Sequence, residues 1–337
     1  MIFAGVRFLL GAGEAVIYPA TNQFVSRWIP VQERGIANGL IFAGVGVGAG
    51  VTPTLITYMM LHYGWRSAFW ISALIGVLAG MIWFLVARDT PDQHHRVSPA
   101  ELEHIQSGLS GPSPASGANK GAQRTAAIRT IPWKDILASR NVWAVSFSYF
   151  CFGYVAWLFF SWFFIYLAKV RGLDLKASAF YTTLPFLAMA AGSPIGGAVS
   201  DWLTKRYGSR VGRCAIAVFA FALTALFLAA GSRVASARLA SVVLAGGAGA
   251  LYLSQSSFWS VTAGIASGSP GSVSGFMNMG NQAGGALTAA LTPVIAKDYG
   301  WTTSFLVAAV LALLGAVAWL FIEPERSLAG TPIRSVV

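Results

Sequence analysis

The segment LHYGWRSAFWISA at residues 61–73 recurs 236 positions later as KDYGWTTSFLVAA at residues 297–309. In both copies the shared Tyr-Gly-Trp is followed by Phe and Ala at the same spacing. Without any gap, the match extends over residues 35–83 and 271–319, with 13 identities in 49 aligned positions. This agreement is several-fold above what composition alone would give. The chain therefore contains two related halves. The constant offset indicates that both halves have the same orientation across a membrane.

Apolar stretches of membrane-crossing length recur along the whole chain. Hydrophobic residues make up 55% of the 337 residues and charged residues only 10%, a balance that indicates a protein embedded in lipid. A membrane-crossing helix needs about 20 apolar residues. The alternation typical of barrel strands is absent, so the stretches predict helices. The nine predicted spans are about 2–26, 35–61, 66–87, 141–168, 176–199, 212–232, 238–266, 271–296 and 301–322.

The polar segment 88–140 separates the predicted spans into two groups. It is rich in Ser, Pro and Gly, which is typical of a linker. The predicted fold class is all-α integral membrane, with two parallel helix-bundle halves. The predicted domains are the remainder of an N-terminal half with three helices at 1–87, a cytoplasmic linker at 88–140, a C-terminal half with six helices at 141–322 and a cytoplasmic tail at 323–337.

The repeat also predicts how many helices a complete pair of halves would contain. Four predicted spans lie between the linker and residue 271, whereas only one lies before residue 35. If the halves are equal, about nine of twelve transmembrane helices are present. We therefore expect a chain that is truncated at its N-terminus and begins partway through its first half. The alternative is a protein that naturally has nine spans.

The net charge of +11 does not indicate a nucleic-acid partner, because the basic residues are spread between the helices and form no basic face with interleaved aromatics. Most of them fall in the linker, the tail and the loops on that same side of the predicted topology. The positive-inside rule then places the linker and the C-terminus in the cytoplasm. We expect a multi-pass protein of the cell (inner) membrane.

The sequence predicts neither an enzyme nor a metal site. Cys151 and Cys214 begin different helices, and the four histidines lie in the linker or at the end of a span, so no metal-ligand spacing is present. A membrane enzyme would need clustered carboxylates or a metal set. Asp89 and Asp92, at the start of the linker, are the only close aspartates. We expect no cofactor.

The first predicted span carries two opposite charges, Arg7 and Glu14. They are seven residues apart, which places them on one helix face. Charges inside a membrane are costly and rarely present without a function. In the alignment of the two halves, Arg7 and Glu14 correspond to Val243 and Ala250. The fold therefore does not require charges at these positions. We predict that Glu14 couples transport to protons with Arg7 as its partner; a structural ion pair is the alternative.

A glycine-rich segment ends the span near residue 199 and reads GGAVSDWLTKRYG at 196–208. Glycine permits close crossing of helices, and Asp201 can cap the amino end of a neighbouring helix. We predict a gating latch that involves Gly197, Asp201 and Arg206. A plain tight loop that follows the positive-inside rule is the alternative.

Polar and aromatic side chains interrupt the later spans. Unpaired amides are costly in lipid, so they are expected to face a cavity or one another. Aromatic residues crowd the first span after the linker, where membrane packing is the alternative to a role in lining a cavity. The predicted substrate-binding residues are Asn278, Asn281, Gln255, Ser256, Tyr154 and Trp157.

From Arg7 to about Leu328, the chain resembles the anion:cation symporter family of the major facilitator superfamily. The resemblance implies inward movement of organic anions, such as sugar acids or aromatic carboxylates, together with protons. It also implies that Glu14 is a protonation site, that Arg7 is its partner and that Asn278 is a polar ligand of the substrate. The stretches that carry it are Arg7 to Glu14 with Pro19, YGWR at 63–66 with Phe69, RDTP at 88–91, VSPAELEHI at 97–105, Ser161-Trp162, Tyr166-Leu167, Leu184 to Gly197 with Asp201, and GFMNMGN at 275–281.

Two features depart from that family. Its first helix, which usually supplies a cation for the substrate carboxylate, falls in the part expected to be missing. In addition, residues 40–51 are wholly apolar where members often carry a polar side chain, which favours a less polar acid over a polyhydroxylated one.

The predicted function is secondary active transport, by proton-coupled symport of an organic anion through alternating access. Proton-driven efflux of amphipathic compounds and an inactive truncated transporter are the alternatives. The expected partners are a small organic anion, protons and the lipid bilayer, with no nucleic acid, and we expect a monomer.

Overall fold

The computed structural model describes residues 2–109, 131–266 and 269–328, and this part of the chain is built from helices. The N-terminal elements are α1 (Ile2–Glu14), α2 (Ile17–Trp28), α3 (Arg34–Tyr63) and α4 (Trp65–Val86). The linker contains α5 (Pro99–Leu109) and α6 (Trp133–Ala138). The remaining elements are α7 (Arg140–Ser161), α8 (Phe163–Ile165), η4 (Tyr166–Val170), α9 (Leu175–Ser209), η5 (Arg210–Ala215), α10 (Ile216–Gly231), α11 (Ala237–Tyr252), α12 (Gln255–Ile265), α13 (Pro270–Tyr299) and α14 (Trp301–Trp319).

The predicted repeat is visible in the helix boundaries. Helices α3 and α13 each contain 30 residues. The first and the last residue of α13 lie at the same offset from those of α3 that the sequence repeat shows. The glycine after each helix has a positive φ, 78° at Gly64 and 86° at Gly300. A tryptophan then begins the next helix in both halves. Because glycine has no Cβ, it adopts this backbone conformation without strain, and the shared Tyr-Gly-Trp is a sharp turn between two helices.

The first predicted span is interrupted in the structure. Helix α1 ends at Glu14 and α2 begins at Ile17, so residues 2–26 do not form the continuous helix that the hydropathy predicts. The predicted span 238–266 is interrupted in a similar way between α11 and α12. Hydropathy does not resolve these breaks, because the residues at each break are as compatible with a span as their neighbours.

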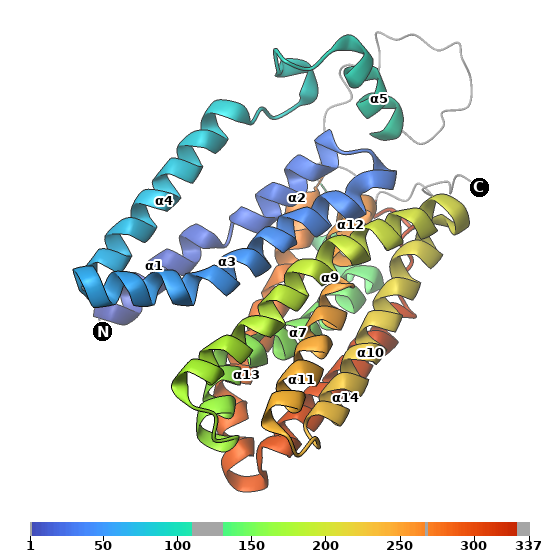
Figure 1. The fold of residues 1–337 in the computed structure, drawn as a ribbon. Helices are drawn as coiled ribbons and strands as arrows, with labels where there is room; N and C mark the ends of the chain where they lie inside the picture. The colour runs from blue at the N-terminus through green and yellow to red at the C-terminus, as the bar shows by residue number, and fades with distance from the viewer. Residues whose placement is uncertain (1, 110–130, 267–268, 329–337) are drawn as a thin grey trace.

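Six segments of the described residues are long and apolar enough to cross a membrane. One of them, Lys176–Gly231, is 56 residues long and covers α9, η5 and α10, which Figure 1 shows as two neighbouring helices. The predicted number of nine spans therefore stays a prediction. The six segments are Val31–Thr52, Trp65–Val86, Arg140–Ser161, Lys176–Gly231, Ala237–Ile265 and Trp301–Trp319.

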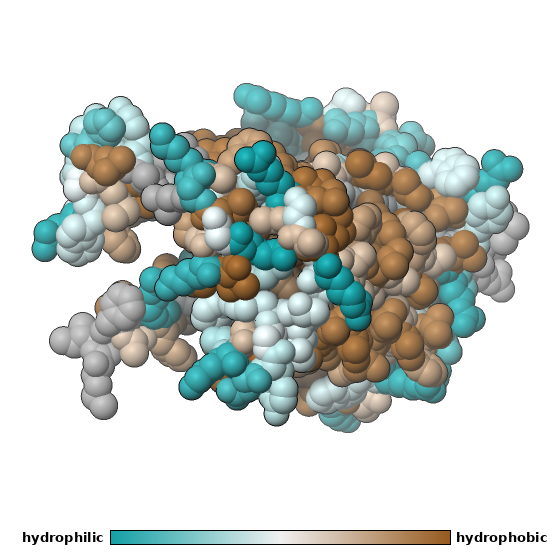
Figure 2. All heavy atoms as spheres, turned by 60° about the horizontal axis from the view of Figure 1, so that its bottom comes forward, coloured by the Kyte–Doolittle hydropathy of each residue, from teal (hydrophilic) through white to brown (hydrophobic). Residues whose placement is uncertain are grey.

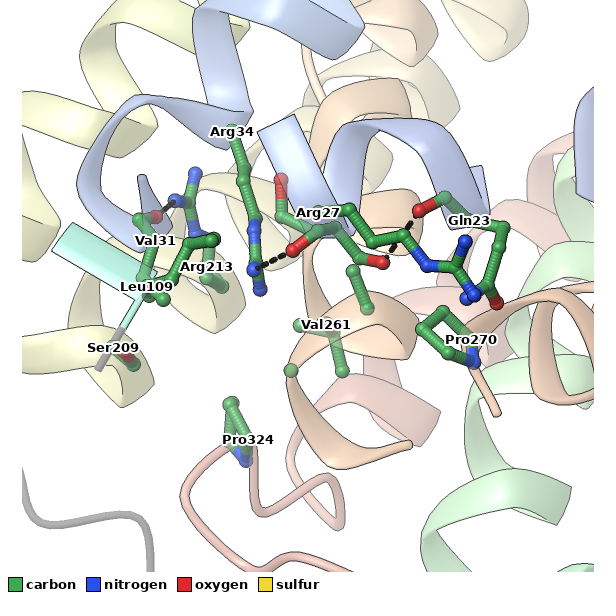
Figure 3. A pocket seen from close by; sticks show the side chains of 14 residues that line it. Gln23, Arg27, Val31, Arg34, Leu109, Ser209, Arg213, Val261, Pro270 and Pro324 are labelled. Atoms are coloured by element: carbon green, nitrogen blue, oxygen red, sulfur yellow. Dashed lines mark hydrogen bonds between the residues drawn. The ribbon is translucent and has the colours of Figure 1, made fainter. Parts of the chain in front are cut away.

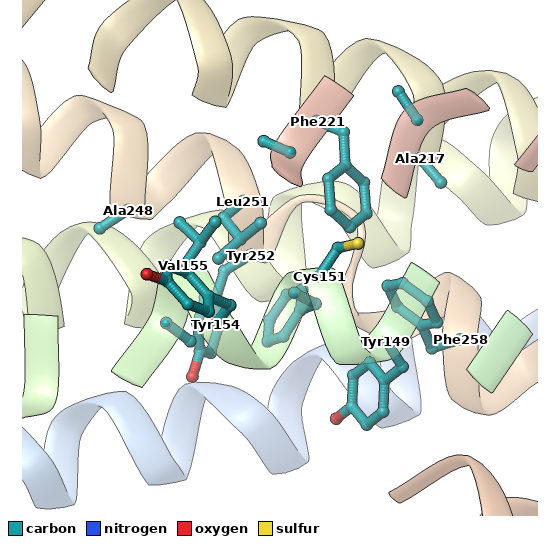
Figure 4. Close-up of a cluster of buried hydrophobic side chains, with 14 of the residues drawn as sticks. Tyr149, Cys151, Tyr154, Val155, Ala217, Phe221, Ala248, Leu251, Tyr252 and Phe258 are labelled. Carbon is teal, nitrogen blue, oxygen red and sulfur yellow. The ribbon is translucent and has the colours of Figure 1, made fainter. Parts of the chain in front are cut away.

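The second half forms a bundle in which α7, α9, α10, α11, α13 and α14 run side by side, as Figure 1 shows. Its core is strongly aromatic: Tyr149, Phe152 and Phe258 lie within ring-contact distance of one another. Figure 4 shows this cluster between α7, α10, α11 and α12, with Phe221 and Cys151 beside it. Polar side chains such as Thr224 and Ser241 are buried in the same bundle and donate to backbone carbonyls of their own helices.

The first half is more open than the second. Helix α3 packs along α9, and α2 packs against α12 and α13. Helix α4 packs against α3 but buries only Ala68, and it stands apart from the bundle in Figure 1. Figure 2 shows large hydrophobic areas on the outer surface, as expected of helices that face lipid.

Glycines make the closest helix crossings. A methyl group at Gly39 or Gly46 of α3 would lie 2.8 Å from backbone atoms of α9. In α13, a methyl group at Gly280 would lie 2.5 Å from the carbonyl oxygen of Ser146 on α7, and one at Gly284 would overlap the carbonyl oxygen of Phe150. Small residues let helix backbones approach closely. The counterparts of these two glycines on α3, Gly44 and Gly48, have no atom of the described chain within 4 Å of such a methyl group.

The linker lies at one end of the bundle, which we call the linker end. Helix α5 meets the segment before α3 there: the side chain of His104 lies 3.7 Å from Glu33, and Gly108 lies against Pro30. At Ile131, which follows the undescribed part of the linker in the sequence, the backbone amide donates to the hydroxyl of Ser269. Figure 1 shows α5 beside the ends of α2 and α3.

Candidate functional site: the contact between the halves

Asp201 joins the two halves at the linker end. It lies on α9, and its carboxylate accepts hydrogen bonds from the first free amides of α3, with Gly35 N at 2.9 Å from Oδ1 and Ile36 N at 2.7 Å from Oδ2. The amides of a helix's first turn have no partner within the helix, and the helix dipole favours a negative charge at that position. Asp201 therefore caps α3 from the opposite half, as the sequence predicts for an aspartate in this motif.

Arg213 completes this contact. It lies on η5, and its Nη2 atom is 2.7 Å from Asp201 Oδ1. The same nitrogen donates to the carbonyl oxygen of Val31 at 3.2 Å, while Nη1 donates to the hydroxyl of Ser200 at 3.0 Å. Asp201 and Arg213 are 5% and 3% exposed. Both residues belong to the second half, so separating the halves would expose this buried ion pair and break its hydrogen bonds to the amides of α3 and the carbonyl oxygen of Val31.

Gly197 provides the space for this contact, whereas Arg206 does not take part in it. A methyl group at Gly197 would overlap the carbonyl oxygen of Gly35, so only glycine permits this crossing. Arg206 is exposed, and its guanidinium lies over the rings of Trp202 and Tyr207 at 6.0 and 5.8 Å. Its predicted gating role stays a prediction. We define the latch as Gly35, Ile36, Gly197, Asp201 and Arg213.

Arg213 was not predicted as a site residue. A signal was available, because Arg213 is one of several basic residues that follow Asp201 within twelve positions. Nothing in the sequence distinguishes Arg213 from the neighbouring basic residues. Which of these side chains faces α9 depends on the π-helical hydrogen bonds of η5.

Three amide side chains add further contacts between the halves. Asn22 on α2 donates to the hydroxyl of Thr262 at 3.2 Å, and Asn38 on α3 donates to the hydroxyl of Ser260 at 3.5 Å. The side-chain oxygen of Gln23 accepts from the amide of Gly271 at 3.2 Å. These residues were not predicted. Together with the latch, they join the two halves at the linker end.

Gln255 lies in an aromatic cluster that both halves build. Its Nε2 atom donates to the hydroxyl of Tyr149 at 2.9 Å, and the indole nitrogen of Trp259 donates to the same oxygen at 3.2 Å. Tyr18 and Phe42 from the first half stack with ring centroids 5.5 Å apart. Both rings contact Trp259, at 5.8 and 5.5 Å. Gln255 was predicted from the sequence as a substrate residue, and that role stays a prediction. The four rings were not predicted, because they look like ordinary membrane aromatics in the sequence.

Several polar atoms next to this cluster are buried without a partner. Among the described residues, no hydrogen-bond partner lies near Gln255 Oε1 or the hydroxyls of Ser256 and Ser257. Buried polar groups without partners are costly. The predicted residues Gln255 and Ser256 thus bring unused hydrogen-bonding capacity to the interface between the halves.

The other predicted substrate residues lie where α7 and α13 pack together. Asn278 is buried on α13, and the backbone of Asn281 lies against Gly153, with its side-chain amide donating to Gln282 at 3.4 Å. Tyr154 is buried and its carbonyl accepts from Thr288 at 2.7 Å. Trp157 is 38% exposed and covers Gly285. The structure thus shows a helix-packing environment for them.

Arg7 and Glu14 lie on α1, away from the latch. Both are exposed in the described chain, and Glu14 is the last residue of α1, directly before the helix break. Figure 1 shows α1 on the side of the molecule opposite to α10 and α14. Glu14 is close enough to Tyr18, a ring of the aromatic cluster, to act on it electrostatically. The coupling role of Arg7 and Glu14 stays a prediction.

A cavity of about 370 Å³ opens at the linker end, between α2, the start of α3, η5 and α12. Figure 3 shows Arg34 and Arg213 side by side on one part of its wall, while Arg27 extends toward Gln23 and Pro270. Within the described ranges, no group of three His, Cys, Asp or Glu side chains could hold a metal ion. The chemistry of this cavity is that of guanidinium groups and backbone carbonyls.

Comparison with known proteins agrees with this architecture. The family model described as Major Facilitator Superfamily matches residues 2–289 and 182–335. The chain is 31% identical over 326 residues to the probable sulfoacetate transporter of Cupriavidus necator, covering 96% of this chain and 73% of that protein. It is 29% identical to the chloroplastic ascorbate transporter of Arabidopsis thaliana, covering 96% of this chain and 58% of that protein. It is 25% identical to the hexuronate transporter of Bacillus subtilis, covering 95% and 72%.

A solved structure has the same fold at low sequence identity. The proton:xylose symporter of the major facilitator superfamily, bound to 6-bromo-6-deoxy-D-glucose, superposes with a TM-score of 0.63 and 13% identity. The match covers 93% of this chain and 69% of the symporter. The family model covers most of the chain, the helices repeat in two related halves and the latch and amide contacts between those halves lie at one end. The chain belongs to the major facilitator superfamily, a family of multi-pass membrane transporters.

Proposed function

We propose that the chain is a secondary transporter that moves a small organic anion across the membrane by alternating access. The observation that carries the proposal is the set of relatives that match nearly the whole chain, which are named for sulfoacetate, ascorbate and hexuronate. Each is a compact acid with polar substituents. We infer a substrate of this class, a sugar acid, an aromatic carboxylate or a short sulfonate or carboxylate.

The contact between the halves supports alternating access. The latch and the three amide contacts lie at the linker end, and they join α2 and α3 to α9, η5, α12 and α13. A transporter needs such a contact to form and break as its halves rock against each other. The latch is suited to this, because the carboxylate of Asp201 and the amides of α3 can form hydrogen bonds with water instead of with each other when the linker end opens. The structure has the linker end closed.

The proposed coupling and substrate residues follow from the resemblance and from the polar atoms at the interface. Glu14 is proposed to load the proton, with Arg7 as its partner, since desolvation in a membrane favours a neutral carboxylic acid in general while a nearby cation favours the carboxylate. For the substrate we propose Gln255 and Ser256, whose buried polar atoms have unused capacity, with Asn278, Asn281, Tyr154 and Trp157 as further contacts. We propose a monomer in the cell (inner) membrane, with the linker and the C-terminus in the cytoplasm.

Uptake in proteoliposomes tests this proposal. The purified chain is reconstituted, and the uptake of radiolabelled sulfoacetate, a hexuronate and ascorbate is measured with and without an inward proton gradient. We expect uptake of at least one of these acids, and acceleration by the gradient. Glu14→Gln is expected to abolish the acceleration. Glu101→Gln, which removes an exposed carboxylate from linker helix α5, is the matched control and is expected to behave like the wild type.

Three results would contradict parts of this proposal. Acid uptake that responds equally to the gradient in the wild type and Glu14→Gln would remove Glu14 from coupling. Export of an amphipathic dye without any acid uptake would favour efflux. No flux of either kind from protein that melts cooperatively would support an inactive chain.

A further inference from the structure

The cavity at the linker end contains more positive charge than the chain itself can balance. Three of its lining side chains are arginines, Arg27 and Arg34 from the first half and Arg213 from the second. No lining residue is acidic. Arg213 is paired with Asp201. Arg34 is only 6% exposed and is close enough to Arg213 to be affected by its positive charge.

Within the described part of the chain, the hydrogen-bond partners of the Arg34 side chain are neutral. Its Nε atom donates to the carbonyl oxygen of Ile29 at 3.2 Å, and its Nη2 atom to that of Ser26 at 2.8 Å. It is also the first residue of α3, where the helix dipole disfavours a positive charge. A buried guanidinium in such a place is expected to have a negative partner.

The chain offers no carboxylate for this purpose. Among the described residues, neither Arg27 nor Arg34 forms an ion pair, and the nearest acid in the sequence, Glu33, lies instead against His104. Glu323 lies 3.8 Å from Arg326. The residues outside the described ranges contain no Asp or Glu. The carboxylates of the described residues therefore leave Arg27 and Arg34 without an ion-pair partner.

We propose that this cavity is a binding site for a small soluble oxyanion, a phosphate, sulfate, sulfonate or carboxylate group, distinct from the substrate path at Gln255. Guanidinium groups bind such oxygens through paired, charge-assisted hydrogen bonds. The volume of about 370 Å³ is at the small end of the usual range for ligand pockets. The site lies at the linker end of the bundle, beside α5, where it is reached from water rather than from the membrane interior.

A bound anion would act on the gate. Arg27 and Arg34 belong to the first half and Arg213 to the second, so an oxyanion between them bridges the halves beside the latch. Without the anion, Arg34 and Arg213 repel each other across the same contact. Binding therefore stabilises the closed linker end, and this effect does not depend on the substrate or on proton coupling.

Binding and stability measurements test the site. The full chain is placed in phosphatidylcholine nanodiscs, and inorganic phosphate or sulfate is titrated at constant ionic strength while the melting temperature and the heat of binding are recorded. We expect a saturable rise in melting temperature. Arg27→Gln, at a half-buried position on α2, is expected to weaken phosphate binding at least tenfold. Arg34→Gln is expected to abolish binding if the variant folds.

Arg210→Gln is the matched control. It removes the same charge from η5, three residues before Arg213, but Arg210 is exposed and does not line the cavity. It is expected to bind phosphate as the wild type does. Equal phosphate binding by the wild type and Arg27→Gln would overturn the proposal. So would stabilisation by nanodiscs containing phosphatidylglycerol but not by free phosphate, because the ligand would then be a lipid headgroup.

Discussion

Replacing Asp201 with Asn removes the charge of the latch and keeps its shape. The amide oxygen can still accept from one amide of α3, but the new NH₂ group faces a second N–H donor. Arg213 then stays 3% exposed without its 2.7 Å partner. Removing one member of a buried ion pair costs about 3–5 kcal/mol. Opening the linker end hydrates the arginine, so most of this cost falls on the closed state alone.

The expected shift is therefore large. At about 1.4 kcal/mol per tenfold change, a loss of about 3 kcal/mol moves the equilibrium between closed and open ends by about 100-fold toward open. Spin labels at Gln32→Cys and Lys205→Cys, two exposed positions beside the latch on opposite halves, report this change as a longer inter-label distance. The native Cys151 and Cys214 are buried, which limits their labelling.

A second aspartate gives the matched control. Asp174 caps α9 through a 2.8 Å bond from the amide of Ala177 and is exposed, so Asp174→Asn makes the same chemical change within one helix. Because Asn caps a helix about as well as Asp does, the expected cost is only the lost charge–dipole interaction, at most about 1 kcal/mol, with no change in the distance distribution. The reasoning would be refuted if Asp201→Asn gave the wild-type distribution, or if both variants shifted it equally.

Two further predictions concern glycines. Gly197→Ala places a methyl group against the carbonyl oxygen of Gly35 and is expected to separate α3 from α9, with a lengthened inter-label distance and slower transport. Gly48→Ala, where no described atom lies within 4 Å of the new methyl group, is its control and should keep the wild-type distance. Gly300→Ala forces an alanine into φ 86° and ψ 160°, a region used almost only by glycine, at a cost of about 1–3 kcal/mol. It is expected to lower the melting temperature by a few degrees, whereas Gly76→Ala within α4 should not; an unchanged melting temperature for Gly300→Ala would contradict the strain argument.

The repeat could be predicted from the sequence because it depends on local features. Gly64 and Gly300 end their helices for the same steric reason, and the two tryptophans that follow begin the next helices at the predicted offset. The interruption after Glu14 could not be predicted, because hydropathy averages over the residues of a break. The number of spans stays open for a related reason, since composition and length do not show where a long apolar helix ends.

The candidate site was predicted in part. The capping by Asp201 was predicted because a carboxylate can accept from the free amides at the amino end of a neighbouring helix, and the structure shows it capping α3; its gating role stays a prediction. Arg213 was not found, since its position relative to Asp201 depends on the π-helical turn of η5. Tyr149 and Trp259 were not found either. Their roles depend on a shared contact with Gln255 that exists only once α7 and α12 are packed together.

The latch joins a side chain of one half to the main chain of the other. Every residue except proline has a backbone amide, so the α3 side of this contact places almost no demand on residue type beyond the need for a small residue at Gly35. The two halves can therefore diverge in sequence while the contact persists. A search for correlated substitutions between the halves would overlook Asp201 and α3, although the carboxylate holds them together.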